Sequence, residues 1–438
     1  MIFLGLFKMK LNVFKNSFWM ILEKVISIFG LIFVTSYVAK YIGPSAFGAI
    51  SFAASLFVII QAISLFGSEH IIFKRVSQNV SSGVRLMHST RFLRGVVFSL
   101  SSLAVLIYIY YTFDVITLVF CVASCVATYF VTQDVLVIYN DATLNSKFNT
   151  IANAIGLISS LLMRFLISHY ELPVIYLAIP IVTTTLIPYF IRIYFFRKQE
   201  AELSTSNREI VWDVKRKYIK YLFFAGLPLA VSGVSITLYT RLSQLVLAKY
   251  GSTAELGIFS AASVLASSWT FITLAFITSF FSEIYRLKDK SSAMKITAKL
   301  NGLVFCICIF IVFWIVVVGK PVVLFLYGEA YQAAYPIMII LAISTSFSAM
   351  GPIAHRYIIK ESGYRYLSYK TVAVFIINIP LVFVLVPLYG IVGAAISSLL
   401  TELISLTVLN YFFQSGVIAK IHFLTLNPKT YHSRNGLN

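Results

Sequence analysis

Charged side chains occur inside stretches of the sequence that are otherwise long and apolar. Arg241 lies within SITLYTRLSQLV, among hydroxyl and amide side chains, and Glu402 lies near the middle of another apolar stretch. An ionised group at the centre of a membrane helix costs about 2.5–3.5 kcal/mol on insertion scales, so it usually faces a water-filled cavity or a partner. A guanidinium suits an anion because its planar fork donates to two oxygens at once. We expect Arg241 to line a cavity, and for Glu402 either a cavity position or a buried structural pair.

Four further charges fall within apolar stretches at different depths. Glu23 and Lys24 are adjacent, so on a helix they point about 100° apart and only one of them needs to face a cavity. Asp134 is near the inner end of its stretch, whereas Arg164 is near an outer end and can extend toward the interface. We take Arg164, Glu23 and Lys24 as candidates that line the cavity. The candidates for proton coupling are Glu402, Asp134 and Glu23.

A second group of cations lies just beyond the ends of apolar stretches. Lys74 and Arg75 occur in GSEHIIFKRVSQ, and Arg356 occurs in HRYIIKESGYR. Cations at these places are also expected from membrane topology alone. Their positions nevertheless suit the collection of an anion at a cytoplasmic opening, so we include all three as candidate substrate-binding residues.

Motifs for catalysis or metal binding are missing from the sequence. The segment VVVGKPVV contains the Gly-Lys pair with which a phosphate-binding loop ends. The glycine required five residues earlier is Trp314, however, and Pro321 replaces the serine or threonine, so the motif does not match. The cysteines lie in apolar runs with no metal-ligand spacing to histidine. We expect no catalytic residue, no metal and no cofactor.

Composition places these residues in a membrane protein. The chain has 438 residues, of which 59% are hydrophobic and 12% charged, and its mean hydropathy is +0.88. A helix that crosses the hydrocarbon core needs about 20 mostly apolar residues. We predict an all-α integral membrane protein with about 12 transmembrane helices, at 16–40, 45–67, 92–111, 115–138, 148–168, 173–191, 221–247, 257–281, 300–318, 336–354, 371–388 and 391–413.

The net charge of +19 predicts the orientation. Most Lys and Arg residues fall at the two ends of the chain and in the loops after even-numbered spans. By the positive-inside rule both termini are cytoplasmic. These cations are accounted for by topology and lipid headgroups, so we expect no nucleic-acid partner.

A repeated stretch indicates an internal duplication. Residues 39–53 read AKYIGPSAFGAISFA and residues 248–262 read AKYGSTAELGIFSAA. The first copy joins spans one and two, and the second joins spans seven and eight. The longest hydrophilic run divides the two sets. We predict two six-helix lobes with pseudo-two-fold symmetry: an N-lobe at 1–196, a cytoplasmic linker at 197–220, and a C-lobe with a cytoplasmic tail at 221–438.

Three segments resemble the bacterial O-antigen flippases (Wzx), a family of the MOP exporter superfamily, which also contains the MATE transporters. They are VAKYIGPSAFGAISFAASL, LYGEAYQAAYPIMIILA and NIPLVFVLVPLYGIVGAAISSLLTE. The resemblance implies two lobes around a cationic cavity. It also implies flipping of an undecaprenyl-pyrophosphate-linked oligosaccharide, the O-antigen repeat unit, across the bacterial inner membrane by alternating access. The implied partners are this lipid-linked oligosaccharide, membrane lipid and the polysaccharide polymerase machinery.

Three alternatives to a flippase stay open. A MATE-like antiporter for small cationic molecules would share the fold but needs acidic sites in its cavity. A membrane enzyme typically needs a long external loop or a catalytic loop, and no long external loop is visible in the sequence. A scaffold without transport activity would leave the charges inside the spans unexplained.

Overall fold

The computed structural model describes residues 30–202, 212–287 and 289–427, and their regular structure is entirely helical. The first half contains, after a π-helical turn at Gly30–Val34, the helices α2 (Thr35–Leu65), α3 (Ser68–Gln78), α4 (Val80–Thr112), α5 (Val115–Gln133), α6 (Leu136–Ala142), α7 (Ser146–His169) and α8 (Ala178–Glu202). The second half contains α9 (Trp212–Tyr250), α10 (Thr253–Ser267), α11 (Thr270–Ile284), α12 (Lys290–Tyr327), α13 (Ala334–Lys360), α14 (Tyr364–Leu406), α15 (Val408–Tyr411) and α16 (Val417–Leu426).

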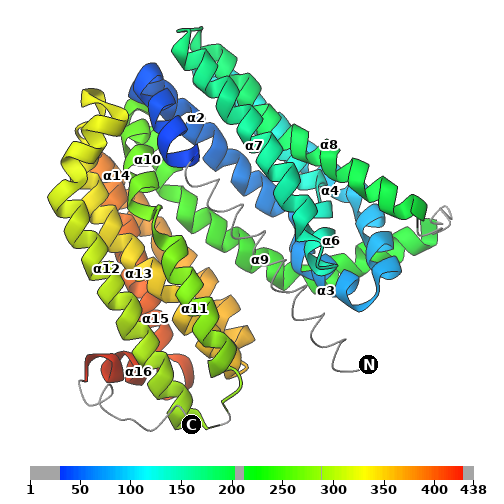
Figure 1. Ribbon diagram of the computed structural model, residues 1–438, viewed down its shortest axis with the longest axis vertical. Helices are drawn as coiled ribbons and strands as arrows, with labels where there is room; N and C mark the ends of the chain where they lie inside the picture. The colour runs from blue at the N-terminus through cyan, green and yellow to red at the C-terminus, as the bar shows by residue number, and fades with distance from the viewer. Residues whose placement is uncertain (1–29, 203–211, 288, 428–438) are drawn as a thin grey trace. The chain divides into compact units, whose positions relative to one another are not determined.

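The chain divides into two compact units, Met1–Thr237 and Leu238–Asn438. Helix α9 contributes residues to both units and begins inside the predicted linker. The division into lobes at 1–196 and 221–438 with a linker at 197–220 therefore stays a prediction. Within the second unit, α12, α13 and α14 run side by side (Figure 1).

Among the described residues, nine helices are long and apolar enough to cross a membrane, or up to ten if the bent helix α9 counts as one span. Two of the long helices are pairs joined at a kink, at Gly43 in α2 and at Gly390 in α14. Both glycines have positive φ, 76° and 54°, a conformation that costs glycine little. The kinks lie where the predicted spans one and two, and eleven and twelve, meet. The expected all-helical membrane fold is confirmed; most of the first predicted span lies outside the described residues.

Helix α9 bends by 52° between Lys217–Phe224 and Gly226–Tyr250. Pro228 lies inside this helix, and proline has no N–H to donate to the carbonyl four residues earlier, at Phe224. The backbone of α9 also passes close to the end of α2, because a Cβ added to Gly226 would lie 2.6 Å from the Phe66 carbonyl oxygen. Small residues at such a crossing let helices approach closely.

The two copies of the repeated stretch have similar burial, each in its own unit. Ala39 and Ala248 are buried, as are Gly48 and Gly257. Lys40 and Lys249, by contrast, are both exposed. The match is partial, because Tyr41 and Ser51 are half-buried whereas Tyr250 is exposed and Ser260 is buried. The duplication therefore stays a prediction.

Candidate functional site

The second unit contains a polar pocket of about 640 Å³. Its walls come from α9, α10, α11, α13 and α14, and many of the side chains that line it carry hydroxyl groups. These are Tyr239, Thr240, Ser263, Ser267, Thr270, Thr273, Ser344, Thr345, Ser348, Ser398 and Thr401. Arg241 and Glu402 line the same pocket. The structure thus brings together two of the residues that the sequence singled out.

Helical spacing explains why the hydroxyl groups gather on one side. Ser263 and Ser267 are four residues apart, as are Ser344 and Ser348, so each pair lies on one face of its helix. The Ser267 hydroxyl donates to the Ser263 carbonyl over 2.7 Å. The Thr270 hydroxyl donates to the Ser267 carbonyl over 2.8 Å. Each hydroxyl keeps free lone pairs that a ligand can use.

Arg241 is half-buried on α9 and donates to the Gln244 side-chain oxygen over 3.3 Å. The neighbouring Ser243 hydroxyl lies 3.2 Å from the Ser397 hydroxyl of α14, which fixes α9 against that helix. A long hydrogen bond to a neutral amide leaves most of the guanidinium donors available.

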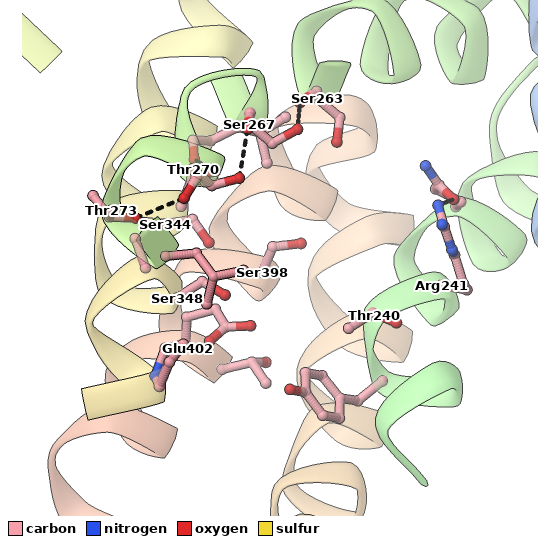
Figure 2. Close-up of a pocket in the computed structure, with 18 of the residues that line it drawn as sticks. Thr240, Arg241, Ser263, Ser267, Thr270, Thr273, Ser344, Ser348, Ser398 and Glu402 are labelled. Carbon is pink, nitrogen blue, oxygen red and sulfur yellow. Dashed lines mark hydrogen bonds between the residues drawn. The ribbon is translucent and has the colours of Figure 1, made fainter. Parts of the chain in front are cut away.

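Glu402 lies on α14 close to groups from three helices. Lys370 of α14, Ser348 of α13 and Tyr239 of α9 interact with it electrostatically. Thr401, the residue directly before Glu402, accepts a hydrogen bond from the Asn378 amide over 2.9 Å. Figure 2 shows Glu402 grouped with Ser348, and Arg241 apart from them on α9. Among the described residues no ion pair joins Arg241 to Glu402, so neither charge neutralises the other directly.

Asp134 lies in the first unit in a buried ion pair. Its side chain and that of Arg192 are each 5% exposed and are directly bonded. A second guanidinium nitrogen of Arg192 donates to Asn153. Asp134 is therefore held by a structural partner, one of the two options that the sequence left open for buried charges.

The remaining candidates are scattered. Lys74 is exposed on α3, and the Arg75 guanidinium lies 5.6 Å from the centre of the Tyr221 ring. Arg164 is half-buried on α7. Arg356 of α13 donates to the Thr278 hydroxyl over 3.0 Å. Glu23 and Lys24 lie outside the described residues.

Three residues of these sites were not found from the sequence. Arg192 and Lys370 each fall one residue outside a predicted span, so they were counted with the loops. Asn378 lies inside span eleven, where an uncharged amide is less conspicuous than a charge. The paired spacing of serines at 263 and 267, and at 344 and 348, is the signal that indicates the pocket. In the part of the chain that the structure describes, no cluster of His, Cys, Asp and Glu is suited to hold a metal ion.

Comparisons with known proteins agree with this fold. The family model described as "Polysaccharide biosynthesis protein" matches residues 13–281, more than half of the chain. A search of the curated proteins found no match. The lipid II flippase MurJ, in an inward closed conformation, is similar in structure with a TM-score of 0.68 and 15% identity, over 94% of this chain and 91% of that one.

Two structures of multidrug resistance MATE transporters of the MOP superfamily are also similar. The inward-facing one has a TM-score of 0.65 and 14% identity, over 92% of this chain and 95% of that one. The outward-facing one has a TM-score of 0.61 and 13% identity, over 95% and 96%. These likenesses confirm the expected fold. This multi-pass membrane protein belongs to the polysaccharide biosynthesis protein family and has the fold of the MOP superfamily transporters.

Proposed function

We propose that the protein is a flippase for undecaprenyl-pyrophosphate-linked oligosaccharide, the O-antigen repeat unit. It moves this molecule from the cytoplasmic to the periplasmic leaflet of the bacterial inner membrane by alternating access of its two lobes, with both termini cytoplasmic. The observation that carries the proposal is the pocket of the second unit, where many hydroxyl groups surround one guanidinium and one carboxylate.

The chemistry of the pocket matches such a substrate. Sugars present hydroxyl groups that exchange hydrogen bonds with serine and threonine side chains, which both donate and accept. Arg241 supplies the donors and the positive charge that a diphosphate needs. In this proposal Lys24, Lys74, Arg75, Arg164 and Arg356 add to the attraction of the anion along its path.

The comparisons support a role in polysaccharide biosynthesis and a flippase fold, but they do not identify the substrate. The family is one of polysaccharide biosynthesis, and a structure with this fold is a lipid II flippase. A fold that serves a flippase in one protein is compatible with a flippase here. The choice of an O-antigen repeat unit as the class of substrate rests on the resemblance of the sequence segments.

Proton coupling is a separate part of the proposal. Glu402 is its leading candidate because it lines the pocket, with Lys370, Tyr239 and Ser348 as the groups that interact with it. Asp134 and Glu23 are the other candidates. Reconstituted transport that does not respond to an imposed pH gradient would remove this part and leave the flippase proposal intact.

A second candidate function is an antiporter for small cations, as in the MATE transporters. The specific observation in its favour is Glu402, a carboxylate that can bind a cation in the pocket. The two functions predict different effects of losing Arg241. An antiporter tolerates loss of Arg241 and fails without Glu402, whereas a flippase for a diphosphate fails without Arg241.

Deletion followed by complementation tests the proposal. We expect the deletion strain to accumulate lipid-linked saccharide on the cytoplasmic leaflet, and Arg241→Ala to restore little surface glycan at parental protein levels. Lys249→Ala is the matched control, since Lys249 is an exposed cation on the same helix and lies outside the pocket. Normal glycan display by the Arg241→Ala strain would refute the role of Arg241.

A further inference from the structure

The first unit contains a smaller cavity, of about 190 Å³, that the proposed transport pathway does not use. It lies between α4, α5, α6 and α8. Buried apolar side chains, including Met87 and Phe196, form part of its wall, and the three arginines Arg91, Arg94 and Arg197 line it as well. None of the described residues that line it is acidic.

Arg94 is the unusual member of this cavity. It is 1% exposed, and its Nη1 donates to the Thr90 hydroxyl over 2.7 Å. Its Nε and Nη2 atoms are buried and have no partner among the described residues. A buried ionised group that lacks a counter-charge is strongly unfavourable, and unsatisfied donors of this kind often mark the place of an ion.

Local acids do not supply the missing counter-charge. Asp134 is close in sequence to Gln133, which lines the cavity, but its carboxylate is bonded to Arg192. Arg91 adds a second positive charge, and its Nη2 donates to the Tyr189 hydroxyl over 2.9 Å. The cavity therefore combines excess positive charge with unused donors on α4.

We propose that this cavity binds a phosphate group, carried either by the headgroup of an anionic membrane lipid or by a soluble phosphate. Guanidinium groups match phosphate because they donate to two of its oxygens. The site is distinct from the Arg241 pocket, because its lining residues all belong to the first unit and those of the Arg241 pocket all belong to the second. The inference does not depend on the proposed function.

The position along α4 suits a lipid headgroup. Arg91 and Arg94 lie in the first half of this helix, and the apolar run predicted as a span begins at residue 92. Cationic pockets between helices at this depth on the cytoplasmic side bind anionic headgroups. A bound lipid would stabilise the first unit by mass action.

Thermal unfolding and native mass spectrometry of the purified full-length protein test the site. The lipid arm compares phosphatidylglycerol with phosphatidylcholine of the same acyl chains. The soluble arm compares inorganic phosphate with chloride at equal ionic strength. The variants are Arg94→Met, which keeps the side-chain volume, and Arg197→Gln on α8. Arg85→Gln is the control, because Arg85 is an exposed cation of the same helix outside the cavity.

We expect phosphatidylglycerol to raise the melting temperature of the parent by about 3 °C or more. We expect Arg94→Met to weaken its binding about 10- to 100-fold, as for loss of charged hydrogen bonds. Arg197→Gln should weaken binding less, and Arg85→Gln should leave it unchanged. A different result is that inorganic phosphate raises the melting temperature as much as the lipid does, and that this rise is lost in Arg94→Met. That result supports the site with a soluble phosphate as its occupant.

Two results would overturn the inference. One is the absence of any selective effect of either anion on the parent. The other is equal binding by the parent and by both Arg94→Met and Arg197→Gln. If Arg94→Met does not fold, Arg197→Gln alone decides, because its side chain is exposed and its loss leaves the core intact.

Discussion

The buried pair of Asp134 and Arg192 allows a quantitative prediction about the stability of the first unit. Both side chains are 5% exposed, and Asn153 is the other hydrogen-bond partner of the guanidinium. Asp134→Ala therefore leaves a buried cation with a single neutral partner. Removing one partner of a buried ion pair costs about 3–5 kcal/mol, because the other charge stays buried and uncompensated.

This cost predicts a large drop in melting temperature. A unit of this size loses about 2–4 °C for each kcal/mol, so Asp134→Ala should melt about 6–20 °C below the parent. Arg192→Met should have a similar effect, because it leaves the carboxylate unpaired. The double variant has neither charge, and we expect it to lie within about 2 kcal/mol of the parent.

A double-mutant cycle on thermal or denaturant unfolding in detergent measures the coupling. Glu171→Ala serves as the control, because Glu171 is an exposed carboxylate in the same unit. If the effects of the two single substitutions simply add, to within about 0.5 kcal/mol, the pair does not hold the helices together as described. A double variant that folds but loses the response of transport to a pH gradient would instead assign Asp134 to proton coupling.

Three further predictions concern packing, capping and pH. Gly226→Ala should destabilise the protein by about 1–3 kcal/mol, since its Cβ would lie 2.6 Å from a backbone oxygen; an unchanged melting temperature would contradict the close crossing of α2 and α9. Ser252→Ala removes the capping box that Ser252 forms with Glu255 at the start of α10, and unfolding measurements should show a loss of about 1 kcal/mol. Burial lowers the pKa of His422 below its usual value of 6.5, so the fold favours the neutral imidazole, and the stability that this contributes should be lost as pH falls below 6.5. Melting curves between pH 5 and 8 should therefore show an acid decline that is smaller in His422→Gln, and an equal decline in both proteins would contradict it.

The sequence was sufficient for the class of fold because apolar length is a strong signal. Long apolar runs with few charges have few structural solutions other than membrane helices. The boundaries of the helices do not follow from apolar length alone. Glycine allows the chain to turn within one or two residues at Gly43 and Gly390, so adjacent helices follow each other with almost no polar loop between them.

The candidate site was only partly predictable. Arg241 and Glu402 were found because a charge in an apolar run is conspicuous, and both line one pocket. The serines and threonines around them were not found, because single hydroxyl groups are common in membrane helices and only their spacing on a helix shows that they share a face. The pairing of Asp134 with Arg192 does not follow from the sequence, because Arg192 falls one residue outside a predicted span and lies 58 residues further along the chain.

Transport of the proposed substrate by the purified protein tests the central claim most directly. The measurement is the rate at which an undecaprenyl-pyrophosphate-linked oligosaccharide moves between leaflets of proteoliposomes that contain the parent, Arg241→Ala or Lys249→Ala. We predict that the parent and Lys249→Ala accelerate this movement far above protein-free vesicles, and that Arg241→Ala is slower by about tenfold or more, as for loss of a charged hydrogen bond. Movement by the parent no faster than in protein-free vesicles would contradict the account.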